Sequence, residues 1–466
     1  MIIIVPVEID KRELIEKIFL STALVKYCNA KVYLIKSHFF FKKIKKSSDV
    51  IFFDKGIAIT KKNLYKNKLR NNYLISFDVE SPIINWDRMT FNARIPLVNF
   101  KKTSIFFVQN LFDKKKIENI FKKKSKIIIS GNPKFELSKK KNCNIIFSEE
   151  IKKIKEEFGS NYYFFSSSFS NDLYGGNKLW NYHTKKIYKF DDSSIKKKEF
   201  DFYHNNDEKN YLALIELAIQ TAKAFPKKKI IFRPHPTQDI NLVKKRFPKS
   251  LHNLHIVYKF HSTPWIFNCE YFFHSHCSTS FEAFILKKKI IQFYKTKLTR
   301  HLEYFNNFSK AGQYKNYNEV IKKIKRENFT FSKNEKKSLK TYSLNSSKNS
   351  HKIIANAINQ KFKNIKSKII FNELNYQNDS YFVIFLKKIL VFLKHFSQKT
   401  GLIYILDYFF DLKPNFFLNK IIKDAKGSEL NKYEIDGYLK KTNKIYKSIV
   451  KSEKVDKNIF LISRKK

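Results

Sequence analysis

The sequence predicts an α/β protein of two domains, each built on a parallel sheet, followed by a mainly helical C-terminal extension. Short continuous apolar runs alternate with helical patterns from residue 2 to about residue 294. A polar linker and a charged helix interrupt this series once, near residues 138–159, and the pattern changes after about residue 328. Apolar strands separated by helices indicate parallel sheets covered on both faces, and 466 residues suit two domains and an extension.

The first domain is predicted over residues 1–140. An apolar strand at Ile2–Glu8 is followed by apolar residues at helical spacing over Lys11–Cys28, and a second helical pattern covers Lys115–Lys124. The other short apolar runs are predicted as strands. They are Lys31–Ile35, Asp49–Phe53, Asn72–Asp78, Ser104–Asn110 and Ser125–Pro133.

The second domain is predicted over residues 145–330, with Ser138–Asn144 as the boundary. Helices are expected at Glu149–Gly159 and Asn206–Phe225. Two open α/β domains that face each other bind ligands at the carboxyl ends of their strands. The strands expected here are Tyr162–Ser168, Lys228–Pro236, His255–Phe260, Cys269–Ser275 and Lys288–Tyr294.

The extension, residues 331–466, opens with a polar stretch at Lys333–Ser350 and then becomes helical in pattern. Tyr381–Phe396 mixes large apolar residues with lysine. Such a helix can lie in a membrane interface, or it can pack on the protein with its lysines directed outward. Both interpretations remain open at this stage.

The formal charge of +52 first suggests a nucleic-acid partner, but only nine of the 93 basic residues are arginine. Nucleic-acid readers favour arginine for bidentate contacts, so no nucleic acid is expected. The charge should attract anionic substrates and anionic membranes. Four unevenly spaced cysteines predict no disulfide framework. No signal peptide or run of 18 apolar residues is recognised, so we expect a cytoplasmic protein, peripheral to the inner face of the inner membrane where it contacts lipid.

The segment Arg233-Pro234-His235-Pro236 follows the end of a predicted strand. Its prolines stiffen the turn and prevent it from continuing as helix. Arginine and histidine side chains are both suited to phosphate oxygens. We therefore predict that Arg233 and His235 bind the phosphate of a donor, although a rigid turn with two surface polar residues would show the same pattern.

The second half of the same phosphate site is predicted where a strand ends and a helix begins at Ser278, Thr279 and Ser280. Free N–H groups and hydroxyls at a helix start can bind an anion. Thr279 and Glu282 have the spacing of a capping box, which is the structural explanation of the same residues. Ser167, at the end of the first strand of the second domain, is predicted as a weaker donor contact.

Asp78 and Glu80 follow a strand of the first domain and are predicted to face the same cleft from the opposite side. Transfer to an acceptor hydroxyl needs a base, and either carboxylate could serve. The alternative is that they cap the next helix or stay solvated. No metal is expected, because the spacing of five His and Cys residues of the second domain fits no paired-ligand site: His261, Cys269, His274, His276 and Cys277.

The sequence resembles bacterial surface carbohydrate biosynthesis proteins over roughly residues 1–330. The segments that carry the resemblance occur in the order seen in that family. They are IIIVPVEIDKREL, FFDKGI, ISFDVES, IISGNPKFEL, FFSSSFS, FRPHP and STSFEAFILKKKIIQF. The resemblance implies a GT-B glycosyltransferase architecture, in which a Rossmann-like acceptor domain faces a Rossmann-like nucleotide-donor domain.

More broadly, these motifs look like those of bacterial sialyltransferases and Kdo transferases, which use CMP-activated sugars. By this resemblance Glu80 takes the position of the base and His235 that of the histidine in the HP motif. Ser278, with Thr279 or Ser280, takes the position of the hydroxyl pair that contacts the CMP phosphate. The acidic motif departs from the family, since Val79-Glu80-Ser81 stands where two acids and a glycine are expected.

The resemblance thus implies a transferase of surface polysaccharide, capsule or lipopolysaccharide synthesis. It would move a sialic-acid-like or Kdo-like sugar from CMP to a glycan or lipid-linked acceptor, without a cofactor. Polymerases that use CDP-glycerol share a similar arrangement, so a CDP-glycerol-type polyol phosphotransferase is the alternative. A non-catalytic basic scaffold at the membrane is a third interpretation.

Overall fold

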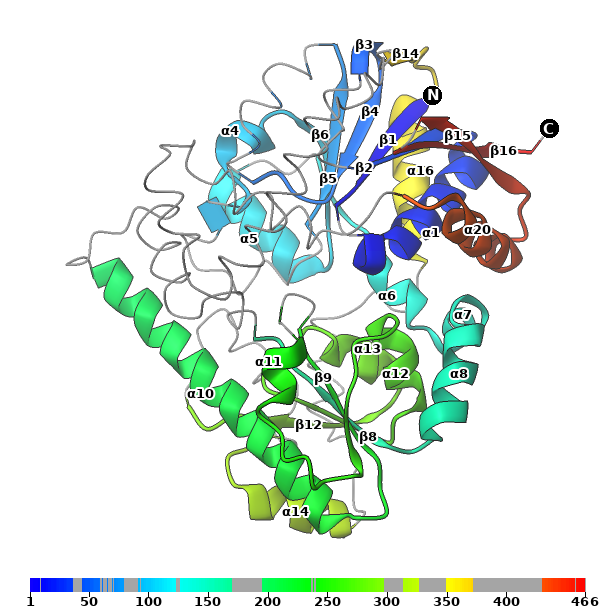
Figure 1. The fold of residues 1–466 in the computed structure, drawn as a ribbon. Coiled ribbons are helices and arrows are strands. Elements are labelled where there is room, and N and C mark those ends of the chain that lie inside the picture. The colour runs from blue at the N-terminus through cyan, green and yellow to red at the C-terminus, as the bar shows by residue number, and fades with distance from the viewer. Residues whose placement is uncertain are drawn as a thin grey trace, which may run out of the picture.

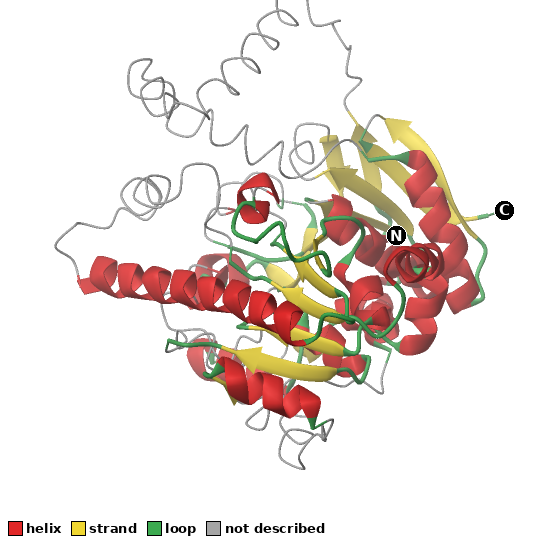
Figure 2. Cartoon of the chain, turned by 60° about the horizontal axis from the view of Figure 1, so that its bottom comes forward, coloured by secondary structure: helices red, strands yellow, loops and turns green. Residues whose placement is uncertain are grey.

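The computed structural model describes most of both domains and parts of the C-terminal segment. The described residues are 1–8, 10–36, 44–58, 61, 65, 69, 71–78, 91–92, 94–122, 126–169, 195–235, 238, 240–296, 313–326, 349–371, 430–456 and 458–465. The helix expected at Tyr381–Phe396 lies outside them. Two sheets stand one above the other, and helices lie on both faces of each (Figures 1 and 2).

The first domain contains an eight-stranded sheet in the order β15-β16-β2-β1-β4-β5-β6-β7. The strands from β2 to β7 run parallel, as predicted from their apolar runs. They are β1 (Ile2–Val7), β2 (Lys31–Lys36), β4 (Ile51–Asp54), β5 (Tyr73–Phe77), β6 (Thr103–Val108) and β7 (Ile127–Ile129).

Both faces of this sheet are buried, because separate apolar cores form on its two sides. One core packs the sheet against α1 (Asp10–Cys28), α16 (Ser350–Phe362) and α20 (Lys432–Tyr446). The other core lies on the opposite face of the sheet, where α4 (Leu97–Phe100) and α5 (Leu111–Phe121) pack. Successive side chains of a strand point to opposite faces of the sheet, and here both faces are buried. The strand sequences are therefore apolar at nearly every position.

The described C-terminal residues join the first domain. Helices α16 and α20 pack on α1, and β16 (Ile459–Arg464) pairs antiparallel with β2 and with β15 (Val450–Asp456). A separate pair joins β14 (Lys368–Phe371) to β3 (Ile44–Ser48). The described part of the expected helical extension therefore contains three strands as well as two helices.

The second domain contains a six-stranded parallel sheet in the order β10-β9-β8-β11-β12-β13. Its strands are β8 (Tyr163–Ser166), β9 (Ile230–Arg233), β10 (Leu254–Ile256), β11 (Tyr271–His274), β12 (Lys289–Phe293) and β13 (Gln313–Tyr314). Two cores again cover its faces. The surrounding helices are α8 (Ser148–Phe158), α10 (Ile195–Ala224), α11 (Ile240–Lys244), α12 (Ser262–Asn268), α13 (Ser280–Ile285) and α14 (Tyr317–Lys325).

The connection between the domains is helical. The chain passes from β7 through α6 (Pro133–Leu137) and α7 (Lys140–Ile146) into α8. Residues 138–144, expected as a polar boundary, lie largely within α7, and Cys143 is fully buried against α1 residues. The four cysteines are buried free thiols, which confirms that they form no disulfide framework.

The predicted fold class is confirmed, because two Rossmann-like sheets face each other, the second parallel and the first parallel from β2 to β7. The second sheet has the doubly wound order in which the first and fourth strands lie side by side at the centre. In the described residues no helix is both long and apolar enough to cross a membrane.

Candidate active site

Each sheet has a topological switch point, where successive connections leave in opposite directions. In the second sheet it lies between β8 and β11, and in the first between β1 and β4. Ligands of open α/β sheets bind outside the carboxyl ends of strands at such points. The carboxyl ends of both sheets point toward the junction of the two domains, where α1, α6 and α13 meet (Figure 1).

The strand register of the second sheet aligns three polar residues at this edge. Ser166 of β8 is paired with Arg233 of β9 on one side and with His274 of β11 on the other. The loop after Arg233 and the turn after His274 therefore leave the sheet at the same level. The sequence predicts that these two segments act together on one phosphate, and the strand register starts both of them from the same edge of the sheet.

The hydroxyl of Thr279 is directed toward the end of β8. It lies 3.3 Å from Ser166 Oγ and 2.9 Å from Cys277 Sγ. Thr279 is the residue before α13, but its side chain makes no capping hydrogen bond. The predicted capping box is therefore wrong, because this hydroxyl contacts the neighbouring strand instead. Ser166 provides the contact between β8 and this turn.

Two further polar groups of this turn have no hydrogen-bond partner among the described residues. They are Ser280 Oγ, on a residue only 3% exposed, and Nδ1 of His276. The nearby His274 accepts a hydrogen bond from the Cys277 N–H at 3.2 Å. Burial lowers the pKa of His274 to about 3 and that of His276 to about 4. Both imidazoles are therefore neutral at neutral pH.

The guanidinium of Arg233 contacts the backbone of the loop that follows β10. Its Nη1 donates to the carbonyl of Lys259 at 2.8 Å, and its Nη2 donates to that of Phe260 at 2.7 Å. Burial lowers the pKa of Arg233 to about 10, so the side chain still carries its charge at neutral pH. Arg233 thus supplies positive charge to the predicted donor edge while fixing a neighbouring loop.

His235 and Ser167 lie in tight turns beside Arg233. The His235 N–H donates to Gln238 Oε1 at 2.7 Å, and its carbonyl accepts from the Gln238 N–H. The Ser167 N–H donates to the Arg233 carbonyl, and Ser167 Oγ accepts from the Phe169 N–H. These bonds keep both turns against the strand ends, which is where the sequence predicted them.

Glu282 is fully buried and connects three elements. Its Oε1 forms an ion pair with Lys134 of α6 at 2.9 Å, and its Oε2 accepts from the Thr263 hydroxyl of α12 at 2.6 Å. Burial alone would raise the pKa of Glu282, but Lys134 and His261 outweigh it, and the pKa is lowered. Glu282 was predicted as a donor ligand, whereas these contacts give it a structural link between the domains.

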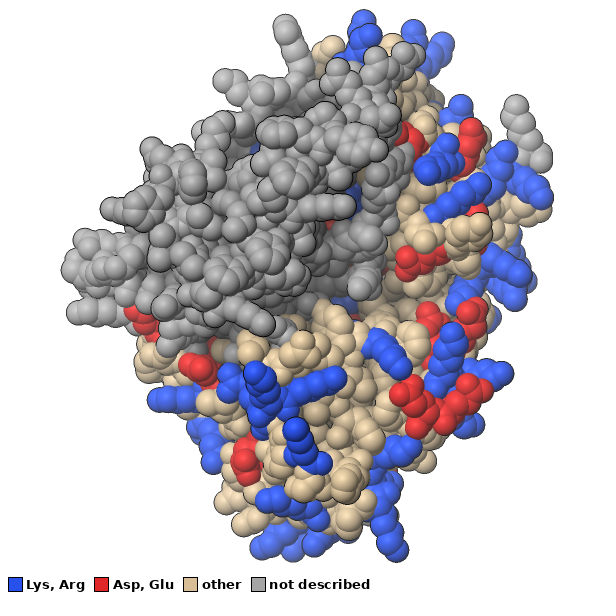
Figure 3. Space-filling view, in the orientation of Figure 1, with Lys and Arg blue, Asp and Glu red and all other residues tan. Residues whose placement is uncertain are grey.

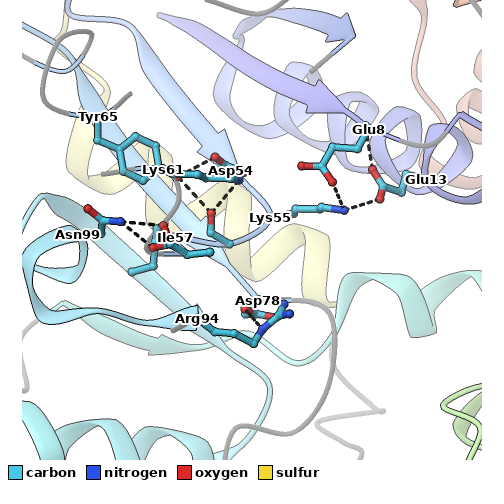
Figure 4. A network of polar contacts seen from close by, with 12 residues as sticks. Glu8, Glu13, Asp54, Lys55, Ile57, Lys61, Tyr65, Asp78, Arg94 and Asn99 are labelled. Carbon is cyan, nitrogen blue, oxygen red and sulfur yellow. Dashed lines mark hydrogen bonds and ion pairs between the residues drawn. The ribbon is translucent and has the colours of Figure 1, made fainter. Parts of the chain in front are cut away.

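The facing edge of the first domain carries a network that the sequence analysis missed (Figure 4). Asp54, the last residue of β4, accepts from Lys61 Nζ at 2.6 Å and from the Tyr65 hydroxyl at 2.7 Å. Both donors also reach the carbonyl of Gly56. Burial, then Asp54, raises the pKa of Tyr65 far above its usual range, so Tyr65 remains a donor.

Lys55 connects the next two elements of this edge. It forms ion pairs with Glu8, which follows β1, at 2.6 Å and with Glu13 of α1 at 2.7 Å. Burial would raise the pKa of Glu13, but Lys55 and Lys17 outweigh it and lower this pKa. The sequence signal was present, since charged residues directly follow two buried strands. These segments were used for strand and helix prediction and for the family resemblance, and no functional role was predicted for their charged residues.

Asp78 follows β5 and is 6% exposed. Arg94 binds both of its carboxylate oxygens, from Nε to Oδ2 at 3.1 Å and from Nη2 to Oδ1 at 2.8 Å. Both oxygens of this carboxylate therefore already accept a hydrogen bond from one cationic side chain. Glu80, the other candidate base, lies outside the described residues.

On the face drawn in Figure 3, the charged side chains of the described residues are not gathered into one patch. Lys and Arg side chains are spread over the visible surface of both domains, with Asp and Glu among them (Figure 3). Within the part of the chain that the structure describes, no three His, Cys, Asp or Glu side chains gather in a way that could hold a metal ion.

No family model matches the sequence, and a search of curated proteins gives no match. Among solved structures, the chain is similar to the UDP-GlcNAc 2-epimerase of Methanocaldococcus jannaschii in complex with UDP-GlcNAc and UDP, with 14% identity, a TM-score of 0.48 and coverage of 77% of this chain and 100% of that one. The chain is also similar to the wall teichoic acid polymerase TagF, with 12% identity, a TM-score of 0.48 and coverage of 78% of this chain and 89% of that one. A third similar structure is the UDP-GlcNAc 2-epimerase of Neisseria meningitidis bound to UDP-GlcNAc, with 11% identity, a TM-score of 0.49 and coverage of 77% of this chain and 100% of that one. Because all three TM-scores are below 0.5, the functional proposal rests on the residues of this chain.

Proposed function

We propose that this protein is a glycosyltransferase of bacterial surface-carbohydrate biosynthesis. It would move a sugar from a nucleotide donor to a hydroxyl of a glycan or lipid-linked acceptor at the inner face of the inner membrane. One observation carries the proposal: the switch points of two parallel sheets face one junction. One edge presents hydroxyl, imidazole and guanidinium groups, and the opposite edge presents carboxylates and ammonium groups.

The second domain would bind the donor, which we propose to be a CMP-activated sialic-acid-like or Kdo-like sugar. His235 and the hydroxyls of Ser278, Thr279 and Ser280 would hold the phosphate, and Arg233 would add its charge. Donors directed at the departing phosphate stabilise the negative charge that grows on it in the transition state. The imidazole N–H and the hydroxyl O–H groups can each donate a hydrogen bond to a phosphate oxygen. This route requires no divalent ion.

The first domain would bind the acceptor, and Glu80 would remove the proton of its attacking hydroxyl. Asp78 is unsuited to this step, because accepting a proton would disrupt its two hydrogen bonds with Arg94. The Asp54 and Lys55 groups at the same edge are already paired. They can orient acceptor hydroxyls as hydrogen-bond partners without acting as bases.

Nucleotide preference separates this proposal from its alternatives. The purified full-length protein is tested by thermal shift with CMP, CDP, UDP and GDP, and CMP release is then followed with CMP-sugars and with CDP-glycerol in separate reactions. A CMP shift and turnover of a CMP-sugar support the glycosyltransferase. Turnover of CDP-glycerol alone would indicate a polyol phosphotransferase using the same pocket. No nucleotide shift, together with salt-sensitive binding to anionic vesicles, would indicate a basic scaffold.

Replacing His235 by Ala should lower turnover by about a hundredfold or more, because a hydrogen-bond donor to the leaving phosphate is lost. Its backbone bonds with Gln238 do not involve the side chain and can form in H235A, and the Tm of H235A is measured so that a loss of turnover is distinguished from a loss of folding. His252, which is exposed, provides the matched control H252A with wild-type turnover. Wild-type transfer by H235A would contradict the assignment of the phosphate site.

A further inference from the structure

Phe260 has a conformation that its side chain does not favour. It lies in the loop after β10 with a φ of 62°, in the left-handed region. Residues other than glycine, asparagine and aspartate rarely adopt this region because Cβ approaches the carbonyl oxygen too closely. The residue is also 36% exposed, and it belongs to none of the buried apolar clusters formed by the described residues.

Neighbouring side chains fix the backbone on both sides of Phe260. The Arg233 guanidinium binds the carbonyls of Lys259 and Phe260, and the indole N–H of the buried Trp265 donates to the Lys259 carbonyl at 2.8 Å. The imidazole of His261 accepts from the Thr263 N–H at the start of α12. The same ring stacks on Phe147, with centroids 5.5 Å apart.

These contacts hold a strained residue in place without burying its ring. Strain of this kind persists where the surroundings over-determine the conformation, and such residues cluster at ligand sites. Phe260 belongs to the loop of the strand next to β9. Adjacent strands are about 4.8 Å apart, so the edge from the end of β8 to Phe260 extends about 10 Å. That span suits a ligand with a phosphate at one end and an aromatic ring at the other.

We propose that Phe260 is the stacking surface for the pyrimidine base of the nucleotide donor, and that Arg233 is the positioning residue that holds it there. The inference rests on the proposed nucleotide-dependent function and adds the residue that recognises the base. Aromatic rings stack on any nucleobase through its face. Phe260 therefore contributes affinity for the base, whereas the phosphate is held near β8, β9 and β11.

The test compares two ligands that differ only in the base. Calorimetric titration with CMP and with ribose 5-phosphate is carried out on the full-length wild type, F260N and F260Y. Asparagine tolerates the left-handed conformation without the ring, and tyrosine keeps the ring. F260N should bind CMP about tenfold more weakly or worse and ribose 5-phosphate as the wild type does. F260Y should bind both like the wild type.

Arg233 is tested through the same ratio of affinities. R233K cannot bind two carbonyls with a planar fork, so its preference for CMP over ribose 5-phosphate should also fall. R233K/F260N should lose no more of that preference than F260N alone, because the two residues act through one contact. Y433N removes an aromatic residue that is 90% exposed on α20, and it should bind both ligands normally.

Three outcomes would overturn the inference. If F260N binds CMP as tightly as the wild type, Phe260 does not contact the base, although the proposed function stands. An equal loss of affinity for both ligands would mean that the substitution disturbs the phosphate site rather than base recognition. If the wild type binds neither CMP, CDP, UDP nor GDP, the proposed function itself fails, and the inference fails with it.

Discussion

His351 is buried between α16 and α1 with both ring nitrogens unsatisfied by the described residues. Its ring meets Phe19 edge-on, with centroids 4.5 Å apart. Burial, together with Lys139 and Lys17, lowers its pKa from 6.5 to about 3. The neutral form is therefore native. Below about pH 6.5 the unfolded chain binds a proton that the folded chain does not bind, so stability falls as the pH decreases toward 3.

H351F should remove this acid sensitivity and stabilise the fold. A phenyl ring fills the same apolar site without buried polar atoms, which is worth about 1–3 kcal/mol. The Tm should rise at pH 8 and rise further at pH 5, as measured by calorimetry at both values. H252F, at the exposed His252, is the control and should leave the pH dependence unchanged. An unchanged pH dependence in H351F would show that His351 does not control acid stability. His274 and His276 would remain as contributors, because burial lowers their pKa values in the same direction.

At the scale of elements, the ion pair between Lys134 and Glu282 connects α6 to α13. The Glu282 side chain is 0% exposed and that of Lys134 is 16% exposed. K134M would leave a buried carboxylate without its cation, which costs about 3–5 kcal/mol. K134M/E282Q should recover most of that loss, since glutamine removes the charge and can still accept from Thr263.

Shifts in Tm of the two single variants and the double variant measure this coupling. The matched control is K152M, because Lys152 pairs with Glu156 at 3.8 Å with both side chains more than half exposed. Exposed pairs contribute about 0–1 kcal/mol, so K152M should change the Tm little. Equal effects of K134M and K152M would mean that the buried pair does not stabilise the domain junction.

The sequence predicted those strands and helices that a short stretch of residues is enough to recognise. Continuous apolar runs located the parallel strands of both sheets up to β12, because burial on both faces removes polar residues from them. Strand β15 was missed because VKSEKVD lies mostly exposed at a sheet edge and shows no apolar run. The capping box failed for a different reason. The Thr279 hydroxyl contacts Ser166, and Glu282 contacts Lys134, and neither long-range partner has a signal in the local sequence.

At the scale of the whole molecule, the C-terminal residues complete the first domain. The termini lie on the same side of this domain (Figure 1), and β16 pairs along β2. The predicted extension could not be placed from sequence, since pairing between residues 31–36 and 459–464 depends only on the fold. Because β15 and β16 add to the sheet beyond β2, strands β1, β4 and β5 lie inside it with strands on both sides. The carboxylates at the carboxyl ends of these three strands, Glu8, Asp54 and Asp78, are therefore carried by central strands.

A chain that ends at residue 429 should therefore not fold into a stable protein. It lacks seven buried apolar residues of the first domain: Leu430, Ile435, Leu439, Val450, Ile459, Phe460 and Ile462. Each contributes about 1.5–3 kcal/mol by burial, so together they approach or exceed the net stability of a typical domain, about 5–15 kcal/mol. The loss would also open the edge of β2 to pairing with other chains.

We expect this shortened chain to aggregate, or to show no cooperative thermal transition by circular dichroism and no Tm shift with CMP. Co-expression of residues 430–466 as a separate chain should restore solubility, because the missing strand and helix can dock onto β2 and α1. The full-length variant K451S/E453S changes only exposed or partly exposed positions of β15 and should keep the wild-type Tm. A soluble shortened chain with the wild-type Tm would show that the first domain is stable without its C-terminal strands.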